Sequence, residues 1–372
     1  MKIGFDAKRA FYNKTGLGNY SRNIFIYLNK YYPENKYFLF SPKEKNSYNF
    51  ENKENAKIIL ANGFIGKKIP SLWRTFFINK DIENEQLDIY HGLSNELPKG
   101  INSNTTKTVV TIHDLIFLRF PKLYKPADRF IYNKKFRYAC QKADKIIAIS
   151  KQTKHDIIRY YKINPEKIEV VYQSCDPIYY KKCSSQKKEL VRKKYNLPSQ
   201  YILNVGTVEK RKNILSAIKA IKFGKINTPL VIVGRKTSYQ KEIDRFIDEN
   251  NLKNKIIFIE NVDFLDLPAI YQMSCLFVYP SIFEGFGIPI IEAINSKVPV
   301  ITSNVSSLPE AGGKNSIYVE PYNIEQIAEA IKKILDNETL KNEMIEKSYN
   351  FIQKFRGQNI AKDIMNVYLK VK

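Results

Sequence analysis

Short apolar runs alternate along most of the chain with longer segments in which apolar positions recur three and four residues apart. The longer spacing is that of an amphipathic helix, and a short continuous apolar run is typical of a strand buried on both faces. The runs that we expect to be strands lie at residues 2–5, 37–40, 58–60, 89–92, 109–112, 145–149, 168–172, 201–205, 230–233, 256–259, 276–279 and 300–302. Strands that alternate with helices predict parallel sheets. The fold class is therefore α/β, with two doubly wound, Rossmann-like domains.

A polar stretch over residues 173–186 interrupts this alternation. It contains an Asp-Pro pair and a Cys-Ser-Ser triplet, which favour turns over helices and strands. We therefore expect the linker between the domains here. The first domain would cover residues 1–178 and the second residues 179–355.

Polar residues predict the starts of three helices. Ser150 precedes a segment with helical apolar spacing and is expected to be an N-cap. Thr237 with Gln240, and Asn323 with Gln326, have the spacing of a capping box. In that motif each side chain bonds to the backbone N–H of the other residue.

Charge narrows the choice of partners. The 372 residues, 44% of them hydrophobic, suffice for two domains with packed cores. The 61 Lys and Arg residues outnumber the 37 Asp and Glu residues, so the formal net charge is +24. Such a charge favours anionic partners, which are nucleotides, an anionic lipid surface or nucleic acid. A surface of solvated lysines explains the same charge without any partner.

Several classes of protein are disfavoured by what the chain contains. The four cysteines are scattered without a C-x-x-C pair, and there are three histidines, so we expect no zinc site and a reduced, cytosolic compartment. The chain begins M-K-I-G-F-D, which predicts a first strand rather than a signal peptide. No run approaches the ~20 apolar residues that span a membrane. We therefore expect a cytoplasmic protein.

The segment Y-P-S-I-F-E-G-F-G-I-P-I-I-E-A, residues 279–293, carries the strongest candidate chemistry. A predicted strand ends in a loop with Glu284, Gly285 and Gly287, and a helix follows from Pro289. Glycine lets the backbone approach a ligand closely, and a helix start offers N–H groups that suit a phosphate. Glu284 and Glu292 could accept hydrogen bonds from hydroxyl groups of the same ligand. The alternative is an ordinary turn with two solvated glutamates.

A basic cluster lies at a second predicted helix start. Gly206 follows a predicted strand, and Lys210, Arg211 and Lys212 precede a helix that begins near Asn213. The dipole at a helix N-terminus disfavours cations. An anionic ligand bound between these side chains would explain their placement.

The first half of the chain holds weaker candidates. Gly16 and Gly18 stand between the first strand and a helix, where a phosphate or substrate loop and a plain turn are both possible. His113 follows the predicted strand 109–112, at the edge where open α/β sheets bind ligands. The alternative for His113 is a hydrogen-bonded core histidine.

Taken together, these motifs resemble those of the retaining glycosyltransferases of family 4, which have the GT-B fold. The string E-G-F-G-I-P-x-x-E-A resembles the E-x7-E signature of that family, G-T-V-E-K-R-K-N from Gly206 resembles its donor-phosphate motif, and T-I-H-D-L around His113 resembles its acceptor-domain motif. Many members have arginine directly after the glycine, where this chain has Thr207. Members with the G-T-x-E-x-R-K-N form share that departure.

The resemblance implies roles for individual residues. Arg211 and Lys212 would neutralise the leaving diphosphate, Glu284 would hold donor-sugar hydroxyls, and His113 would orient the sugar. Glu292 would hold the ribose. The other residues that we expect to bind the donor are Gly16, Gly18, Gly206, Gly234, Val262, Gly285, Phe286, Gly287 and Ile288. No metal or cofactor is expected, and residues 356–372 would form a helix that returns to the first domain.

The resemblance also implies the reaction, which is transfer of a hexose from a nucleoside-diphosphate sugar with retention at the anomeric carbon. GDP-mannose is the first expectation, by similarity to bacterial polysaccharide mannosyltransferases, followed by UDP- and dTDP-hexoses. The acceptor would be a glycan or lipid-linked glycan. Basic and large apolar residues mix between Lys67 and Lys80, which is compatible with an anionic membrane surface or with a core helix that has basic ends.

Other functions remain open at this point. A nucleotide-sugar epimerase or a pyridoxal-dependent phosphorylase could share the fold, and a protein that binds nucleotide-sugar without turnover would share the site. The charge of +24 is also compatible with nucleic-acid binding. Against that, the aromatic residues lie mostly in apolar periodic segments, and no known DNA- or RNA-binding motif is present, so we expect no nucleic-acid partner.

Overall fold

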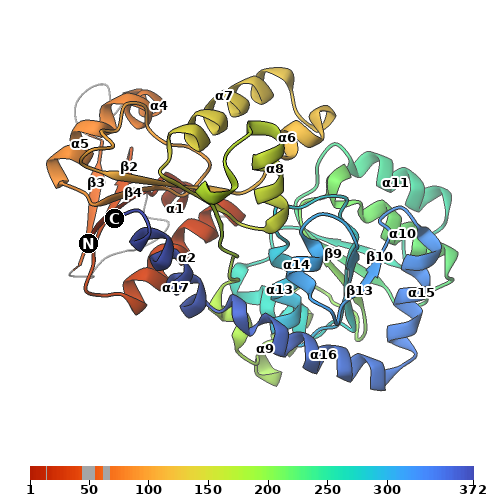
Figure 1. Cartoon of the computed structure of the whole chain (residues 1–372). Coiled ribbons are helices and arrows are strands. Elements are labelled where there is room, and N and C mark those ends of the chain that lie inside the picture. Colours follow the sequence, from red (N-terminus) through yellow and green to blue (C-terminus); the bar gives the residue numbers. More distant parts are fainter. Residues whose placement is uncertain (14, 44–54, 62–67) are drawn as a thin grey trace. The chain divides into compact units, whose positions relative to one another are not determined.

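The computed structural model describes residues 1–13, 15–43, 55–61 and 68–372 (Figure 1). The chain divides into two compact units. Unit 1 comprises residues 1–174 together with residues 355–372, and unit 2 comprises residues 175–354.

The described part of unit 1 contains a seven-stranded sheet in the order β3-β2-β1-β4-β5-β6-β7. Its strands pair in parallel, as continuous apolar runs predict. They are β1 (Lys2–Asp6), β2 (Lys36–Ser41), β3 (Ala56–Leu60), β4 (Ile89–Gly92), β5 (Lys107–Ile112), β6 (Lys145–Ala148) and β7 (Ile168–Val170). The strand order reverses direction between β1 and β4, where Phe5 lies opposite His91. Ligands of open α/β sheets bind at the carboxyl ends of the strands beside such a switch point.

Helices cover both faces of this sheet. They are α1 (Lys8–Tyr12), α2 (Gly16–Tyr31), α4 (Pro70–Leu72), the π-helix η1 (Trp73–Phe77), α5 (Ile78–Glu85), α6 (Ile116–Arg119), η2 (Pro121–Leu123), α7 (Pro126–Lys142), α8 (Lys151–Tyr161), η3 (Pro165–Lys167) and the carboxyl-terminal α17 (Gly357–Leu369). One buried apolar cluster joins α2 and α17 to the sheet, and another joins α5, α7 and α8 to it. A doubly wound sheet with helices on both faces is confirmed for this unit.

Every residue of unit 2 is described, and six strands form its sheet in the order β10-β9-β8-β11-β12-β13. They are β8 (Ile202–Val205), β9 (Leu230–Val233), β10 (Ile256–Ile259), β11 (Leu276–Tyr279), β12 (Val300–Ser303) and β13 (Ile317–Val319). The pairs are parallel, and the switch point lies between β8 and β11. Strand β13 is an addition to the predicted set, because a three-residue run that is half exposed gives little apolar signal.

The helices of unit 2 alternate with these strands. They are η4 (Pro177–Tyr180), α9 (Ser185–Lys194), η5 (Lys210–Lys212), α10 (Ile214–Phe223), α11 (Gln240–Glu249), η6 (Phe264–Asp266), α12 (Leu267–Gln272), α13 (Ile288–Asn295), α14 (Leu308–Gly312), α15 (Ile324–Leu335), α16 (Glu338–Ile352) and η7 (Gln353–Phe355), whose last residue belongs to unit 1. Apolar residues of α10, α11 and α15 pack on the sheet in one buried cluster.

The predicted helix caps have mixed outcomes. Ser150 is the N-cap of α8, and its hydroxyl accepts the Thr153 N–H at 3.0 Å, which confirms that prediction. The Asn323 side chain accepts the Gln326 N–H at 3.0 Å, but the Gln326 side chain accepts from Glu320 instead of completing the box. The box at Thr237 is wrong. Helix α11 begins at Gln240, and the Thr237 hydroxyl accepts the Tyr239 N–H at 3.2 Å within the preceding turn.

Of the segment between Lys67 and Lys80, Lys67 lies outside the described residues. The remainder forms α4, η1 and the start of α5. Trp73 and Ile78 are buried, whereas Phe76 is 47% exposed. The segment therefore presents apolar side chains on two sides, one to the core and one to solvent. Among the described helices, none is both long and apolar enough to cross a membrane.

Candidate active site

The turn between β11 and α13 has the backbone that its glycines permit. Gly287 is the N-cap of α13 and has φ of +119°, in the left-handed region that side chains with a Cβ rarely adopt. Pro289 lies in the first helical turn, where its missing N–H costs no hydrogen bond. The loop from Glu284 to Gly287 thus ends directly at a helix N-terminus.

Two serines that follow the neighbouring strand β12 hold this loop by hydrogen bonds. Ser306, which has φ of +61°, follows β12 and accepts the Glu284 N–H at 3.1 Å. The Ser307 hydroxyl donates to the carbonyls of Glu284 at 2.8 Å and of Phe286 at 3.0 Å. Ser306 and Ser307 are therefore positioning residues for the loop. The sequence shows the string S-S-L-P-E but does not indicate what the two hydroxyls bind.

The structure brings Glu284, Arg211 and Lys212 into one cluster. The Glu284 carboxylate lies 2.7 Å from Lys212 Nζ and, through its other oxygen, 2.7 Å from an Arg211 guanidinium nitrogen. Arg211 also donates to the Phe283 carbonyl at 2.7 Å and to Glu209 at 2.6 Å. Tyr279 donates to Glu284 at 3.1 Å. All three charged side chains are largely buried, with exposed fractions of 10% for Glu284, 15% for Arg211 and 14% for Lys212.

Electrostatics keep this cluster ionised. Burial alone would raise the pKa of Glu284, but Lys212 and Arg211 outweigh it and hold that pKa at about 2. Burial would likewise lower the pKa of Lys212, and Glu284 reverses this, so the Lys212 pKa lies above its usual value. At neutral pH the site therefore presents two cations that share one carboxylate. Lys212 also lies 5.0 Å from the centre of the Tyr279 ring, within the range of a cation–π contact.

Gly206 and Gly234, the predicted glycines directly after β8 and β9, let the chain come into close contact at the ends of these strands. A Cβ on Gly234 would lie 1.9 Å from the carbonyl oxygen of Gly206, and Gly206 has φ of +153°. The Lys212 side chain lies 3.7 Å from the point where a Gly206 Cβ would stand. Val262 follows β10 in the loop before η6. Since β10, β9, β8 and β11 are adjacent and parallel, Gly206, Gly234, Val262 and the Glu284 loop all lie at one edge of the sheet.

Glu292 lies one helical turn inside α13. It accepts the Tyr271 hydroxyl at 2.9 Å, and burial raises the pKa of Glu292 to about 7 against the effect of that hydrogen bond. Its carboxyl group therefore changes charge near neutral pH. Tyr271, from α12, is a partner that the spacing of the motif does not predict.

His113 lies in unit 1, directly after β5. Its Nε2 lies 2.9 Å from the Leu93 carbonyl and must carry the proton, and the Gln173 amide donates to Nδ1 at 3.3 Å. Burial lowers the pKa of His113 to about 4, so the ring is neutral at physiological pH. The ring also packs edge-to-face with Tyr20 at 4.7 Å. His113 is therefore a buried, hydrogen-bonded histidine, as the alternative interpretation of the sequence predicts.

Gly16 and Gly18 begin α2 in the same unit. A Cβ on Gly18 would lie 1.9 Å from the Asn13 carbonyl oxygen, whereas a Cβ on Gly16 would meet nothing within 4 Å. Gly18 is therefore required by close packing of the turn, and Gly16 leaves open space at the helix N-terminus.

In the residues described, no three His, Cys, Asp or Glu side chains are grouped so that they could hold a metal ion.

Comparisons with known proteins match both halves of the chain to glycosyltransferase families. Residues 186–351 match the family described as glycosyl transferases group 1, and residues 27–177 match glycosyltransferase family 4. O-antigen chain mannosyltransferase B of Escherichia coli is 29% identical over 286 residues, which cover 75% of this chain and 74% of that protein. O-antigen chain mannosyltransferase RfbU of Salmonella typhimurium is 31% identical over 261 residues, which cover 69% of this chain and 68% of that protein.

A solved structure shows the same fold over the whole length. The complex of Anabaena Alr3699/HepE with UDP aligns with a TM-score of 0.75 over 100% of both chains, at 16% sequence identity. Two parallel, doubly wound sheets and this likeness confirm the predicted fold class. The chain therefore belongs to the glycosyltransferases of group 1 and family 4, with the GT-B fold.

Proposed function

We propose that this glycosyltransferase moves mannose from GDP-mannose to a glycan or lipid-linked glycan during synthesis of a cell-surface polysaccharide, with retention at the anomeric carbon and without a metal. Both relatives described above are O-antigen mannosyltransferases by name, which supports the sugar and the pathway class. The observation that carries the chemistry is the buried cluster of Glu284, Arg211 and Lys212 at the sheet edge of unit 2.

The two cations suit the leaving group. As the bond between the anomeric carbon and the phosphate oxygen breaks, negative charge grows on the diphosphate. Arg211 and Lys212 bind that charge, and the N–H groups at the start of α13 and in the Gly285–Gly287 turn add to it. Interactions that strengthen as charge develops lower the barrier rather than only tightening substrate binding. In other enzymes a metal ion stabilises the negative charge of such a leaving group. Here the side chains of Arg211 and Lys212 provide that positive charge, which supports metal independence.

Glu284 has two tasks in this proposal. It keeps Arg211 and Lys212 in place before the donor arrives, and its remaining lone pairs accept hydrogen bonds from hydroxyl groups of the donor sugar. Glu292 accepts from the ribose hydroxyls. The base lies against the loop after β10 that contains Val262.

Retention follows from reaction on one face of the sugar. The acceptor hydroxyl forms the new bond to the anomeric carbon on the side from which the diphosphate leaves, and its proton passes to the departing phosphate oxygen. This reaction therefore needs neither a side-chain nucleophile nor a side-chain base. His113, which is neutral and held by Leu93 and Gln173, orients the sugar.

The first experiment measures turnover of Glu284→Ala with GDP-mannose, UDP-hexoses and dTDP-hexoses. The expected loss exceeds about tenfold, equivalent to ~1.4 kcal/mol of transition-state stabilisation. Turnover within tenfold of the wild type would refute the role of Glu284. The anomeric configuration of the product, read by NMR, tests retention, and an assay with excess chelator tests metal independence.

A further inference from the structure

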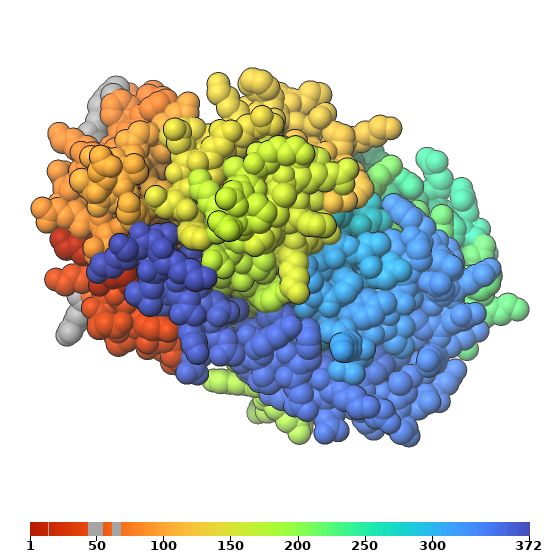
Figure 2. Space-filling view, in the orientation of Figure 1, coloured from red at the N-terminus to blue at the C-terminus, as the bar shows by residue number. Residues whose placement is uncertain are grey.

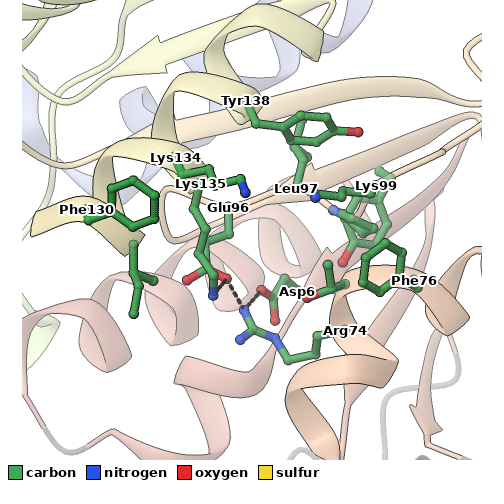
Figure 3. Close-up of a pocket in the computed structure, with 14 residues that line it drawn as sticks. Asp6, Arg74, Phe76, Glu96, Leu97, Lys99, Phe130, Lys134, Lys135 and Tyr138 are labelled. Carbon is green, nitrogen blue, oxygen red and sulfur yellow. Dashed lines mark hydrogen bonds and ion pairs between the residues drawn. The ribbon is translucent and has the colours of Figure 1, made fainter. Parts of the chain in front are cut away.

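Unit 1 contains a pocket that the donor chemistry does not use. Its volume is about 390 Å³, and it opens between η1, α7 and the segment after β4 (Figure 3). Asp6, the last residue of β1, and Tyr90, in β4, both line it. The pocket therefore lies beside the switch point of the unit 1 sheet, as the Glu284 cluster lies beside that of unit 2. Ligands of open α/β sheets generally bind at such positions.

A network of charges forms the floor of this pocket. The Arg74 guanidinium pairs with Asp6 and lies 3.6 Å from Glu96, and Lys135 lies 3.2 Å from the same Glu96 carboxylate. Arg74 and Asp6 are nearly inaccessible, with side chains 11% and 8% exposed. The dashed contacts in Figure 3 show that the two carboxylates are already engaged by cations. The two carboxylates therefore neutralise part of the positive charge that Arg74 and Lys135 bring to the pocket.

The rim of the pocket is apolar and positively charged. Phe130 is 71% exposed, Ile131 48% and Phe76 47%, although large apolar side chains are usually buried. Lys99 and Lys134 stand among them, and neither has an ion-pair partner within the described parts of the chain. Lys99 Nζ lies 5.4 Å from the centre of the Phe76 ring. The lining contains four cationic side chains and two carboxylates, so it carries a net positive charge.

We propose that this pocket binds an apolar chain that ends in a phosphate or diphosphate, which is the lipid end of a lipid-linked acceptor. The apolar chain lies against Phe76, Phe130 and Ile131, and the phosphate meets Lys99 and Lys134. Exposed aromatic groups beside unpaired ammonium groups fit an amphiphilic anion better than they fit a neutral glycan or a free phosphate. This inference rests on the proposed transfer function, because it assigns the acceptor's place.

The test measures binding of farnesyl diphosphate to the full chain by calorimetry, below the concentration at which the probe forms micelles. Trp73, the residue before Arg74, is the chain's single tryptophan, so its fluorescence reports locally on the pocket wall. Farnesol and inorganic diphosphate serve as probes that carry only the apolar or only the anionic half. We expect both to bind at least about tenfold more weakly than farnesyl diphosphate.

Two exposed positions allow variants that should not disturb folding. Phe130→Ser and Lys134→Gln are each expected to weaken farnesyl diphosphate binding about tenfold. The matched controls are Lys142→Gln, an exposed lysine on the same helix α7 outside the pocket, and Phe223→Ser, a phenylalanine of unit 2 that is 57% exposed. Both controls should bind the probe as the wild type does.

Three outcomes would overturn the proposal. These are absence of farnesyl diphosphate binding, binding that Phe130→Ser and Lys134→Gln leave unchanged, and equally tight binding of inorganic diphosphate. Loss of binding to anionic phospholipid vesicles in the same variants, without any binding of farnesyl diphosphate, would assign the surface to a membrane instead. GDP binding to unit 2, measured in parallel, separates failure of this proposal from failure of the proposed donor chemistry.

Discussion

The Glu284 carboxylate and the Lys212 ammonium group lie 2.7 Å apart, although 72 positions separate them in the sequence. Arg211 binds the other oxygen of the same carboxylate at 2.7 Å. The Glu284 carboxylate therefore holds two buried cationic side chains next to each other at the edge of the unit 2 sheet. A donor diphosphate that reaches these cations competes with Glu284 for them, and this competition can be measured.

Replacing Glu284 with glutamine should destabilise the free protein yet increase its response to nucleotide. Removing one partner of a buried ion pair leaves uncompensated charge and costs about 3 kcal/mol or more. GDP would then supply the missing negative charge, so the rise in Tm on adding GDP should be larger for Glu284→Gln than for the wild type. Thermal unfolding with and without GDP measures both effects.

The control for this prediction is Glu343→Gln, because Glu343 is an exposed carboxylate on α16 that pairs with Lys347 at the surface. Its response to GDP should equal that of the wild type. If Glu284→Gln responded to GDP less than the wild type, Arg211 and Lys212 would not be the diphosphate site.

The two glycines at the start of α2 should differ sharply on substitution by alanine. The Cβ of Gly18→Ala would lie 1.9 Å from the Asn13 carbonyl oxygen, so the backbone must move, and we expect a loss of about 2 kcal/mol or more. Gly16→Ala meets nothing within 4 Å and should stabilise the protein by roughly 0.4–1 kcal/mol by restricting the unfolded chain. Denaturant unfolding followed by Trp73 fluorescence reports on unit 1. Equal effects of the two substitutions would contradict the packing described here.

Strands β9, β10 and β11 could be predicted to the residue, because strands buried on both faces leave continuous apolar runs in the sequence. The residue types of the site could be predicted for a similar reason, since Glu284, Arg211 and Lys212 belong to local motifs. The ion pairs between these residues could not be predicted, because a contact across 72 positions of the sequence depends on the order of the strands in the sheet.

Other parts of the structure leave little trace in the sequence. Ser306, Ser307 and Tyr271 act on the site through hydroxyl groups that any loop or helix could carry. The Arg74–Asp6 pair spans 68 positions and has no local signature either. At Thr237 the capping-box pattern in the sequence gave a wrong prediction. The Thr237 hydroxyl bonds to Tyr239 within a turn, and the helix begins only at Gln240.

Unit 1 should lose stability as the pH falls below about 6.5 because of two buried histidines. Burial lowers the pKa of His91 to about 3 and that of His113 to about 4, from an ordinary value of 6.5. A lowered folded-state pKa means that the unfolded chain takes up the protons first. Stability is therefore complete above pH 6.5 and declines toward pH 4, by about 1.4 kcal/mol per pH unit for each histidine.

The measurement is urea unfolding at a series of pH values, followed by Trp73 fluorescence. His91→Gln should lower stability at neutral pH, since His91 bonds Tyr368 at 2.7 Å and Thr111 at 2.8 Å, and should halve the dependence on pH. His155→Gln, at an exposed position of α8, is the matched control for the substitution itself. A stability that is flat between pH 6.5 and 4 would show that these two histidines are not buried in solution.

Donor affinity should rise as the pH increases through about 7, because of Glu292. Burial raises the pKa of Glu292 to about 7, so its carboxyl group is neutral below this pH and ionised above it. An ionised acceptor binds ribose hydroxyls more tightly than a neutral one, by about 1 kcal/mol or roughly fivefold in Kd. Calorimetry with GDP-mannose in the absence of acceptor measures this, since its phosphodiester groups do not titrate near neutrality.

Two variants test whether Glu292, rather than another titrating group, causes the pH dependence of GDP-mannose binding. Glu292→Gln should flatten the pH dependence of GDP-mannose binding. Tyr271→Phe removes the hydrogen bond at 2.9 Å that favours the ionised carboxylate, so the midpoint should move to higher pH. A midpoint that stays in place in Tyr271→Phe would mean that a different group titrates, and Glu292 would then lose its role as the ribose acceptor.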